Sequence, residues 1–182
     1  MATSKKHTLR WLPLDNAAKI YPAARRKNWS NVFRLSVTLN EPVDPAVLRS
    51  ALEVTGKRFP SMTVRLRRGA FWYYLQQLSS MPELGQEYSY PLIPMSKQEI
   101  RRSALRIITH ENRIAIECFH SVTDGNGALI FLKTLTAEYL QQKHGITIPA
   151  ECGILESFKD TNALRKDGDY GLDDFGDQSY KG

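Results

Sequence analysis

Residues 113–127 read RIAIECFHSVTDGNG, and this stretch decides the fold. Residues 113–119 form a mostly apolar run, which predicts a buried strand. His120 follows directly where that strand ends. Residues 128–139 repeat their apolar side chains at helical spacing, and Gly145 is typical of a helix end. The stretch therefore predicts a strand, a turn that carries His120, and a helix.

The preceding segments predict partners for that strand. Residues 105–108 form a second apolar strand, and the short turn 110–112 joins the two strands. Residues 62–66 and 71–75 predict another hairpin, with its turn at 68–69. Residues 33–39 alternate apolar and polar side chains, as in a strand with one wet face.

Helices are predicted around these strands by their end signals. Asp44 and Pro45 are typical of a helix start, and Gly56 and Pro60 of its end. Short helical turns are expected at 14–20 and 96–102, with an edge strand near 88–90 in an otherwise irregular segment. The order of elements predicts an α/β (α+β) fold: a two-layer sandwich with a mainly antiparallel mixed sheet.

Composition limits the class of protein. The chain has 182 residues, 42% apolar and 24% charged, which is ordinary globular composition. It has two cysteines, no secretory signal and no apolar run of about 18 residues. We expect a cytoplasmic protein without a membrane span. His7, His110 and His144 lie in polar contexts without metal-ligand spacing, so no metal and no bound cofactor are expected.

Charge is unevenly distributed along the chain. The net charge is +6, yet residues 153–182 hold seven acidic and four basic residues, so the first 152 residues carry +9. A basic body favours an anionic partner, namely nucleic acid, anionic lipid or a phosphate-bearing small molecule. We expect two regions: residues 1–158 as the folded part, and 159–182 as a polar, acidic linker or disordered tail.

His120 is the strongest candidate for chemistry. Imidazole is the natural general base for an alcohol or thiol near neutral pH, and Asp124 and Gly125 can fix the turn that carries it. Gly127 allows a close approach of backbone or ligand. The alternative is purely structural: His120 ends the strand and Asp124 caps the helix. The pattern of these residues alone leaves both alternatives open.

The residues that flank His120 resemble those of a known family. A strand that ends in FH, followed by xxxDGxG and a helix such as ALIFLKTLTAEYL, resembles the CoA-dependent acyltransferase superfamily. This superfamily includes chloramphenicol acetyltransferase and condensation domains. Residues 14–22 (LDNAAKIYP), 31–39, 58–60 (RFP) and 67–73 (RRGAFWY) are most similar to bacterial alcohol acetyltransferases. The resemblance covers residues 10–158.

The resemblance implies roles for individual residues. His120 matches the second His of the HHxxxDG motif and is the implied general base. Asp124 matches the motif Asp, whose implied role is structural, through a buried contact, and Gly125 matches the motif Gly. Phe119 replaces the first His, a change that this superfamily tolerates. No residue is assigned to binding the CoA.

The resemblance also implies a substrate and a missing part. The co-substrate would be acyl-CoA, and the acceptor a small alcohol or amine. Monomeric members are about twice as long, with two halves that face each other across the active site. We therefore expect this chain to be the N-terminal half, which a second half or self-association would complete.

Two other hypotheses compete with the acyltransferase hypothesis. The chain could be a non-catalytic relative that binds a partner or a carrier protein, because fold does not imply function. Arg65, Arg67 and Arg68, with Trp72 and Tyr73, could bind nucleic acid. We favour a solvated sheet face and core aromatics for these five residues and expect no nucleic-acid partner. Cys118 is interpreted as a buried core thiol and not as a nucleophile.

Overall fold

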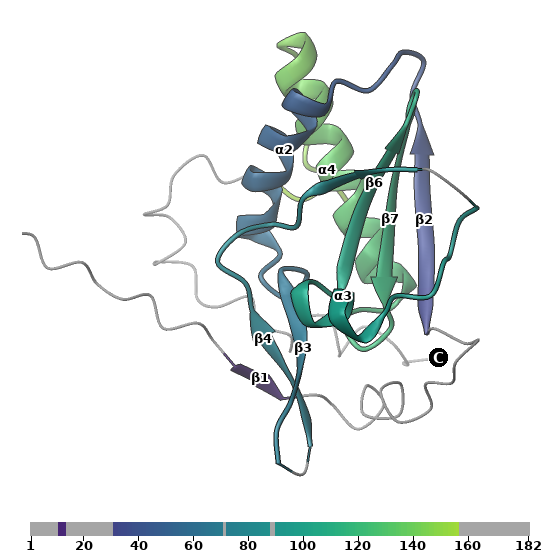
Figure 1. Ribbon diagram of the computed structural model, residues 1–182. Helices are drawn as coiled ribbons and strands as arrows, with labels where there is room; N and C mark the ends of the chain where they lie inside the picture. Colours follow the sequence, from purple (N-terminus) through teal and green to yellow (C-terminus); the bar gives the residue numbers. More distant parts are fainter. Residues whose placement is uncertain (1–10, 14–30, 71, 88–89, 157–182) are drawn as a thin grey trace, which may run out of the picture.

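The computed structural model describes residues 11–13, 31–70, 72–87 and 90–156. Along the chain these residues form β1 (Trp11–Pro13), β2 (Val32–Thr38), α2 (Pro45–Arg58), β3 (Val64–Arg68), β4 (Tyr73–Gln77), β5 (Leu84–Gln86), α3 (Lys97–Arg102), β6 (Leu105–His110), β7 (Arg113–Phe119) and α4 (Gly125–His144). Figure 1 shows α2 and α4 side by side, with α4 behind β6 and β7 and α2 to their left. The predicted fold class, a mixed α/β sandwich with mainly antiparallel strands, is confirmed.

The strands divide into two sheets where one was predicted. The larger sheet has the order β2-β7-β6-β5, in which β5 runs parallel to β6 and the other pairs are antiparallel. The smaller sheet has the order β1-β4-β3 and is antiparallel throughout. The Ala104 N–H donates to the Val64 carbonyl at 2.9 Å, so the two sheets meet where β6 begins beside β3.

One face of the larger sheet forms the core with the helices. Ile114, Ile116 and Cys118 of β7 are buried on this face, opposite Val37, Leu35 and Phe33 of β2. The α2 and α4 helices cover them with fully buried side chains such as Leu48, Leu52, Phe131 and Leu135. Burial of such side chains from water is the main driving force of folding.

Two predicted helix signals, Asp44 and Gly145, act at the expected residues. Asp44 caps α2: its Oδ1 accepts the N–H groups of Ala46 and Val47, at 2.8 and 3.2 Å. Ser96 and Glu99 form a reciprocal capping box at α3, and Gly145 ends α4 with a φ of +65°. A left-handed backbone favours glycine, because other residues meet a steric penalty there.

Gly56 does not end its helix, contrary to the prediction. The α2 helix continues to Arg58 and is capped by Phe59. A Cβ on Gly56 would lie 2.3 Å from the Met81 sulfur, so Gly56 is the position at which α2 admits the buried Met81 side chain. Gly56 therefore serves to pack Met81 against α2 and does not end the helix.

The hairpin of β3 and β4 also departs from the prediction. Trp72 and Tyr73 are 64% and 37% exposed, because they lie at the tip of this hairpin and not in the core. Arg65 and Arg67 lie on the polar face as predicted, and both donate from Nε to the Gln76 side chain, at 2.9 and 3.1 Å.

Other predicted features fall elsewhere. The predicted edge strand near 88–90 is β5, at Leu84–Gln86, and residues 88–89 lie outside the described residues. The predicted helical turn 14–20 and the tail 159–182, with its boundary at 158, also lie outside them. Within the described ranges, no helix is long and apolar enough to cross a membrane.

Candidate active site

His120 lies in the turn between β7 and α4, as the sequence predicts. The β7 strand ends at Phe119, and the Val122 N–H closes a turn onto the Phe119 carbonyl at 2.9 Å. The His120 N–H donates to the carbonyl of Asn31 at 2.8 Å, which ties the turn to the start of β2. His120 itself is half-buried, whereas Ser121 and Val122 are buried. The backbone is therefore fixed while the imidazole keeps a route to solvent.

The environment of His120 favours the neutral imidazole. Burial lowers the pKa of His120, and the Asp124 carboxylate acts in the opposite direction. Burial disfavours the charged form of the ring because a charge loses its hydration there. A neutral imidazole can accept a proton from a reacting hydroxyl or amine. The imidazole of His120 is therefore biased toward the neutral form, which can accept a proton.

Asp124 caps α4 from the surface. Its Oδ1 accepts the Gly127 N–H at 2.7 Å, and its backbone has the extended conformation of a cap residue. The side chain is exposed, so the expected buried contact is not what the structure shows. A cap needs only one helix N–H within reach, and this geometry is satisfied at a solvated helix start.

The two glycines of the turn differ in their surroundings. A Cβ on Gly125 would meet nothing within 4 Å, whereas a Cβ on Gly127 would lie 2.3 Å from the Thr123 hydroxyl. Gly127 therefore permits the Thr123 side chain to fold back over the first turn of α4. Gly125 is exposed and leaves open space beside the turn.

The thiol of Cys118 lies two residues before His120, His144 is the last residue of α4, and His7 lies outside the described residues. Cys118 is fully buried, and burial together with the neighbouring Glu117 carboxylate raises its pKa to about 12, which makes it a poor nucleophile. His144 contacts Glu41 at 2.6 Å at the far end of α4. Within the described ranges, no group of three or more His, Cys, Asp or Glu side chains could hold a metal ion.

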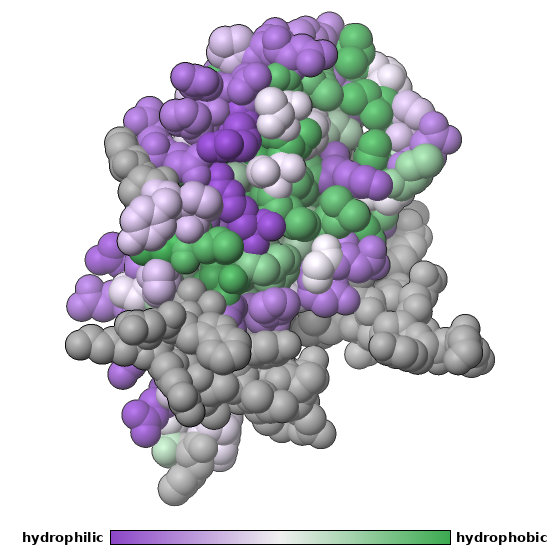
Figure 2. Space-filling model, turned by 90° about the vertical axis from the view of Figure 1, so that its right-hand side faces the viewer, coloured by the Kyte–Doolittle hydropathy of each residue, from purple (hydrophilic) through white to green (hydrophobic). Residues whose placement is uncertain are grey.

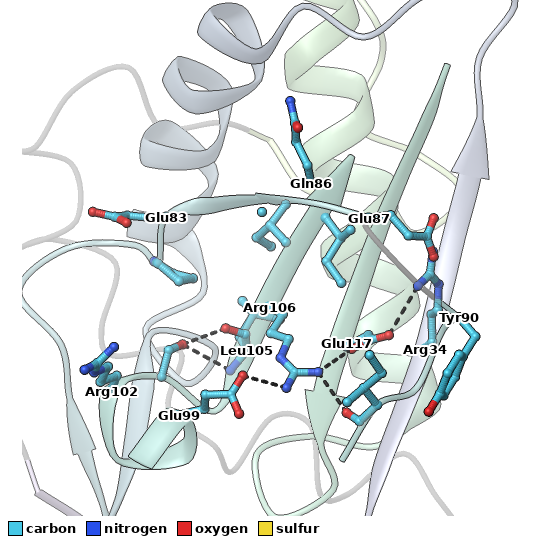
Figure 3. Close-up of a pocket in the computed structure, with 16 residues that line it drawn as sticks. Arg34, Glu83, Gln86, Glu87, Tyr90, Glu99, Arg102, Leu105, Arg106 and Glu117 are labelled. Atoms are coloured by element: carbon cyan, nitrogen blue, oxygen red, sulfur yellow. Dashed lines mark hydrogen bonds and ion pairs between the residues drawn. The ribbon is translucent and has the colours of Figure 1, made fainter. Parts of the chain in front are cut away.

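The opposite face of the larger sheet carries a charged network that the sequence analysis missed. Glu117, in the middle of β7, has a side chain only 2% exposed. Its carboxylate lies 3.2 Å from an Arg34 nitrogen and 2.9 Å from an Arg106 nitrogen, and it also accepts the Leu92 N–H at 2.9 Å. Figure 3 shows Glu117 between these two arginines.

This network forms part of the wall of an open pocket of about 510 Å³. Glu87 and Glu99 pair with the outer nitrogens of Arg34 and Arg106, both at 2.8 Å. Although burial raises the pKa of Glu87, Arg113 and Arg34 hold it below its ordinary value. Since the Glu117 carboxylate is already held by three donors, it serves to fix the segment around Leu92 and not as a free base.

A signal for this network is present in the sequence. Glu117 is the one acidic residue in the apolar run 113–119, and a buried carboxylate requires partners. Arg34 and Arg106 stand opposite Glu117 in the register of β2 and β6. They are 83 and 11 residues away from it, so only the strand pairing shows that all three meet.

Seen from the β2 side, the molecule has a band of apolar surface between polar flanks (Figure 2). In the described sheet, β2 is an edge strand, paired only with β7. Phe33, Leu35 and Val37 are accordingly only partly buried. The candidate site therefore lies at one end of a sheet edge whose outer side is apolar.

Comparison with known proteins identifies the fold. No protein-family model matches the chain, and no curated protein matches it. Among solved structures, the starter condensation domain of rhizomide synthetase RzmA, in a variant solved with C8-CoA, has a TM-score of 0.61 and 13% identity over 78% of this chain. SgcC5 from Streptomyces globisporus has a TM-score of 0.57 and 14% identity over 75%. The X-domain from teicoplanin biosynthesis, solved with OxyB, has a TM-score of 0.57 and 13% identity over 85%.

These likenesses define the class of fold. The described chain has a condensation-domain-like fold. The chain spans less than two fifths of the length of each of the three proteins, namely 38%, 38% and 37%.

Proposed function

We propose that the chain carries the base of an acyltransferase that moves an acyl group from acyl-CoA to the hydroxyl or amine of a small acceptor. One observation carries the proposal: a half-buried His120, biased toward its neutral form, lies in a strand-to-helix turn of a condensation-domain-like fold. The C8-CoA complex of the RzmA condensation domain supports acyl-CoA as the donor class. Within this reaction class we propose the bacterial alcohol acetyltransferases, which the quoted sequence motifs resemble, as the subgroup.

The proposed reaction needs one base in two roles. His120 takes the proton of the acceptor as the acceptor oxygen or nitrogen attacks the thioester carbonyl. The tetrahedral intermediate then collapses, the carbon–sulfur bond breaks, and the imidazolium returns the proton to the departing CoA thiolate. Asp124, Gly125 and Gly127 do not touch the substrate in this scheme; they shape the turn that presents His120.

The tetrahedral intermediate of this reaction carries an oxyanion that needs hydrogen-bond donors. Preorganised hydrogen-bond donors to the developing oxyanion commonly contribute more to the rate of such a reaction than any other group. Because the chain spans less than two fifths of its structural neighbours, we propose that a second half completes the site. The net charge of +6 suits the phosphates of CoA.

The test is a thiol-release assay with acetyl-CoA and C8-CoA against a panel of alcohols and amines. It uses the 182-residue chain alone and with any polypeptide that completes it. His120→Ala should lower the rate by about 10²–10⁴-fold, the contribution of a general base. His110→Ala is the matched control: His110 is the exposed last residue of β6, beside Arg113 at the start of β7, so this variant should keep the full rate.

A His120→Ala variant that turned over at the normal rate would remove His120 from the mechanism. The circular dichroism spectrum and the urea midpoint of each variant show whether a loss of rate reflects chemistry or unfolding.

A non-catalytic binding domain is the second candidate. The match to the X-domain covers 85% of the residues of this chain. The X-domain was solved in a complex with OxyB, and this observation favours a protein partner. Such a domain would release no thiol from any acyl-CoA. It would bind an acyl carrier protein loaded with an octanoyl group equally well with or without the His120 imidazole, as a fluorescence titration can measure.

A further inference from the structure

The side chain that packs on His120 comes from β2. The Phe33 and His120 rings lie 4.4 Å apart between centroids, with their planes inclined by 40°. Phe33 pairs with Cys118 in the strand register, and Cys118 lies two residues before His120. Asn31, two residues before Phe33, accepts the His120 N–H. The start of β2 therefore holds both the backbone and the ring of His120.

An aromatic neighbour can act on an imidazole in two opposite ways. It excludes water, which disfavours the charged ring, or it attracts the imidazolium through its π electrons, which favours the charged ring. At His120 the effect of burial is the larger influence. The sign of the change on removing Phe33 therefore distinguishes the two effects.

Charged groups lie on both the α4 side and the sheet side of His120. On the α4 side, the Asp124 carboxylate acts on His120 and favours its charged form. On the sheet side, Arg34 and Glu117 are the nearest charged neighbours of Phe33 and Cys118 in sequence. They pair with each other on the opposite face of the sheet. Phe33 thus presents an apolar surface to the imidazole.

We propose that Phe33 is a positioning residue for His120. The phenyl ring of Phe33 fixes the orientation of the imidazole and keeps water from one face of the imidazole. This inference rests on the proposed function for its meaning in catalysis, because the neutral, oriented ring is what a general base needs. It extends the site from the turn before α4 to the edge strand β2, which the sequence motif does not include.

The experiment is an NMR titration of the histidine ring protons in the 182-residue chain. His120→Gln identifies the His120 signals among the four histidines. Phe33→Thr removes the ring but keeps a residue that suits a strand. Phe33→Leu keeps the apolar cover without the aromatic ring. Leu35→Thr is the matched control, since Leu35 is likewise half-buried, on the same face of the same strand, and pairs with Ile116.

The expected result is a rise in the pKa of His120 toward its ordinary value in Phe33→Thr, and no change in Leu35→Thr or Phe33→Leu. An unchanged or lowered pKa in Phe33→Thr would overturn the proposal. If Phe33→Thr does not fold, Phe33→Leu decides. Its His120 ring protons should change in chemical shift as the aromatic ring current is lost, at an unchanged pKa. Unmoved ring protons or a lowered pKa would refute the contact or its effect.

The titration needs no turnover, so its failure differs from a failure of the proposed function. If Phe33→Thr shifts the pKa but no acyl-CoA is consumed by the wild-type protein, the positioning stands and the enzymatic proposal falls. In an active protein, Phe33→Thr should also shift the acid limb of the pH–rate profile to higher pH. Leu35→Thr should leave that limb in place.

Discussion

The carboxylate of Asp124 lies on the surface, yet its hydrogen bond to the Gly127 N–H fixes the start of α4. The first N–H groups of a helix have no partner within the helix, and Asp124 satisfies the N–H of Gly127 at 2.7 Å. The negative charge also lies at the positive end of the helix dipole. Both effects stabilise the turn that carries His120, so Asp124 acts on the site through the backbone.

Asp124→Ala should therefore lower the free energy of unfolding by about 1 kcal/mol, the usual cost of a lost cap. Asp124→Ser should recover most of this loss, because a serine oxygen can accept the same N–H bond. Urea unfolding curves measure both values. Equal destabilisation by Ala and Ser would show that the carboxylate has a partner other than the helix.

Residue types in sequence predicted the caps of α2 and α4 in part, whereas the capping box of α3 was not predicted. Asp44 and Gly145 act as predicted, because their roles depend only on neighbouring residues. The buried contact expected for Asp124 was wrong, because a motif states which residue is present but not how deeply its side chain lies. The role predicted for Gly56 was wrong for a related reason. Gly56 makes space for Met81, and Met81 is too distant in sequence for a local pattern to show this contact.

Within β7, the side chain of Glu117 shows how one strand can serve two faces. Its neighbours Ile116 and Cys118 pack under the helices, while Glu117 points to the open face and meets Arg34 and Arg106. A carboxylate that is removed from water needs such partners, because its lost hydration costs several kcal/mol. The network ties β2, β7 and β6 together across their polar face.

Glu117→Ala should destabilise the protein by about 3 kcal/mol, because both arginines lose a buried partner. Glu53→Ala is the control: Glu53 is 57% exposed and pairs with Arg49 one helical turn away, so its loss should cost no more than about 0.5 kcal/mol. Chemical denaturation of both variants gives the comparison. Similar small losses in the two variants would show that the Glu117 network adds little to stability.

At the level of elements, period and end signals predicted α2, α4, β2, β6 and β7 well. The parallel strand β5 was placed too far along the chain, because its three residues LGQ carry no alternation. The division into two sheets could not be predicted, since strand order depends on contacts between distant residues. The Glu117 network escaped notice for this reason as well, although its lone acidic residue was visible in the sequence.

Across the whole molecule, the order of elements was sufficient to predict the fold class, and the comparisons with solved structures agree with it. His120 was found from its motif and its position at a strand end. Phe33 was not connected to it, because 87 residues separate Phe33 from the histidine that it supports. The local motif thus identifies His120, whereas its contact with Phe33 depends on pairing between strands that are far apart in sequence.

The different exposure of the two cysteines allows the opening of the larger sheet to be measured by thiol reactivity. Cys118 is buried between β2, β6 and the helices, and burial raises its pKa to about 12, so its thiol stays protonated near pH 8. Cys152 is exposed. A disulfide reagent should therefore modify Cys152 at once, and Cys118 only when the sheet opens. The second, slower phase would time this opening without any introduced label, and dilute urea should quicken it. Simultaneous reaction of both thiols in native buffer would show that β7 is not shielded.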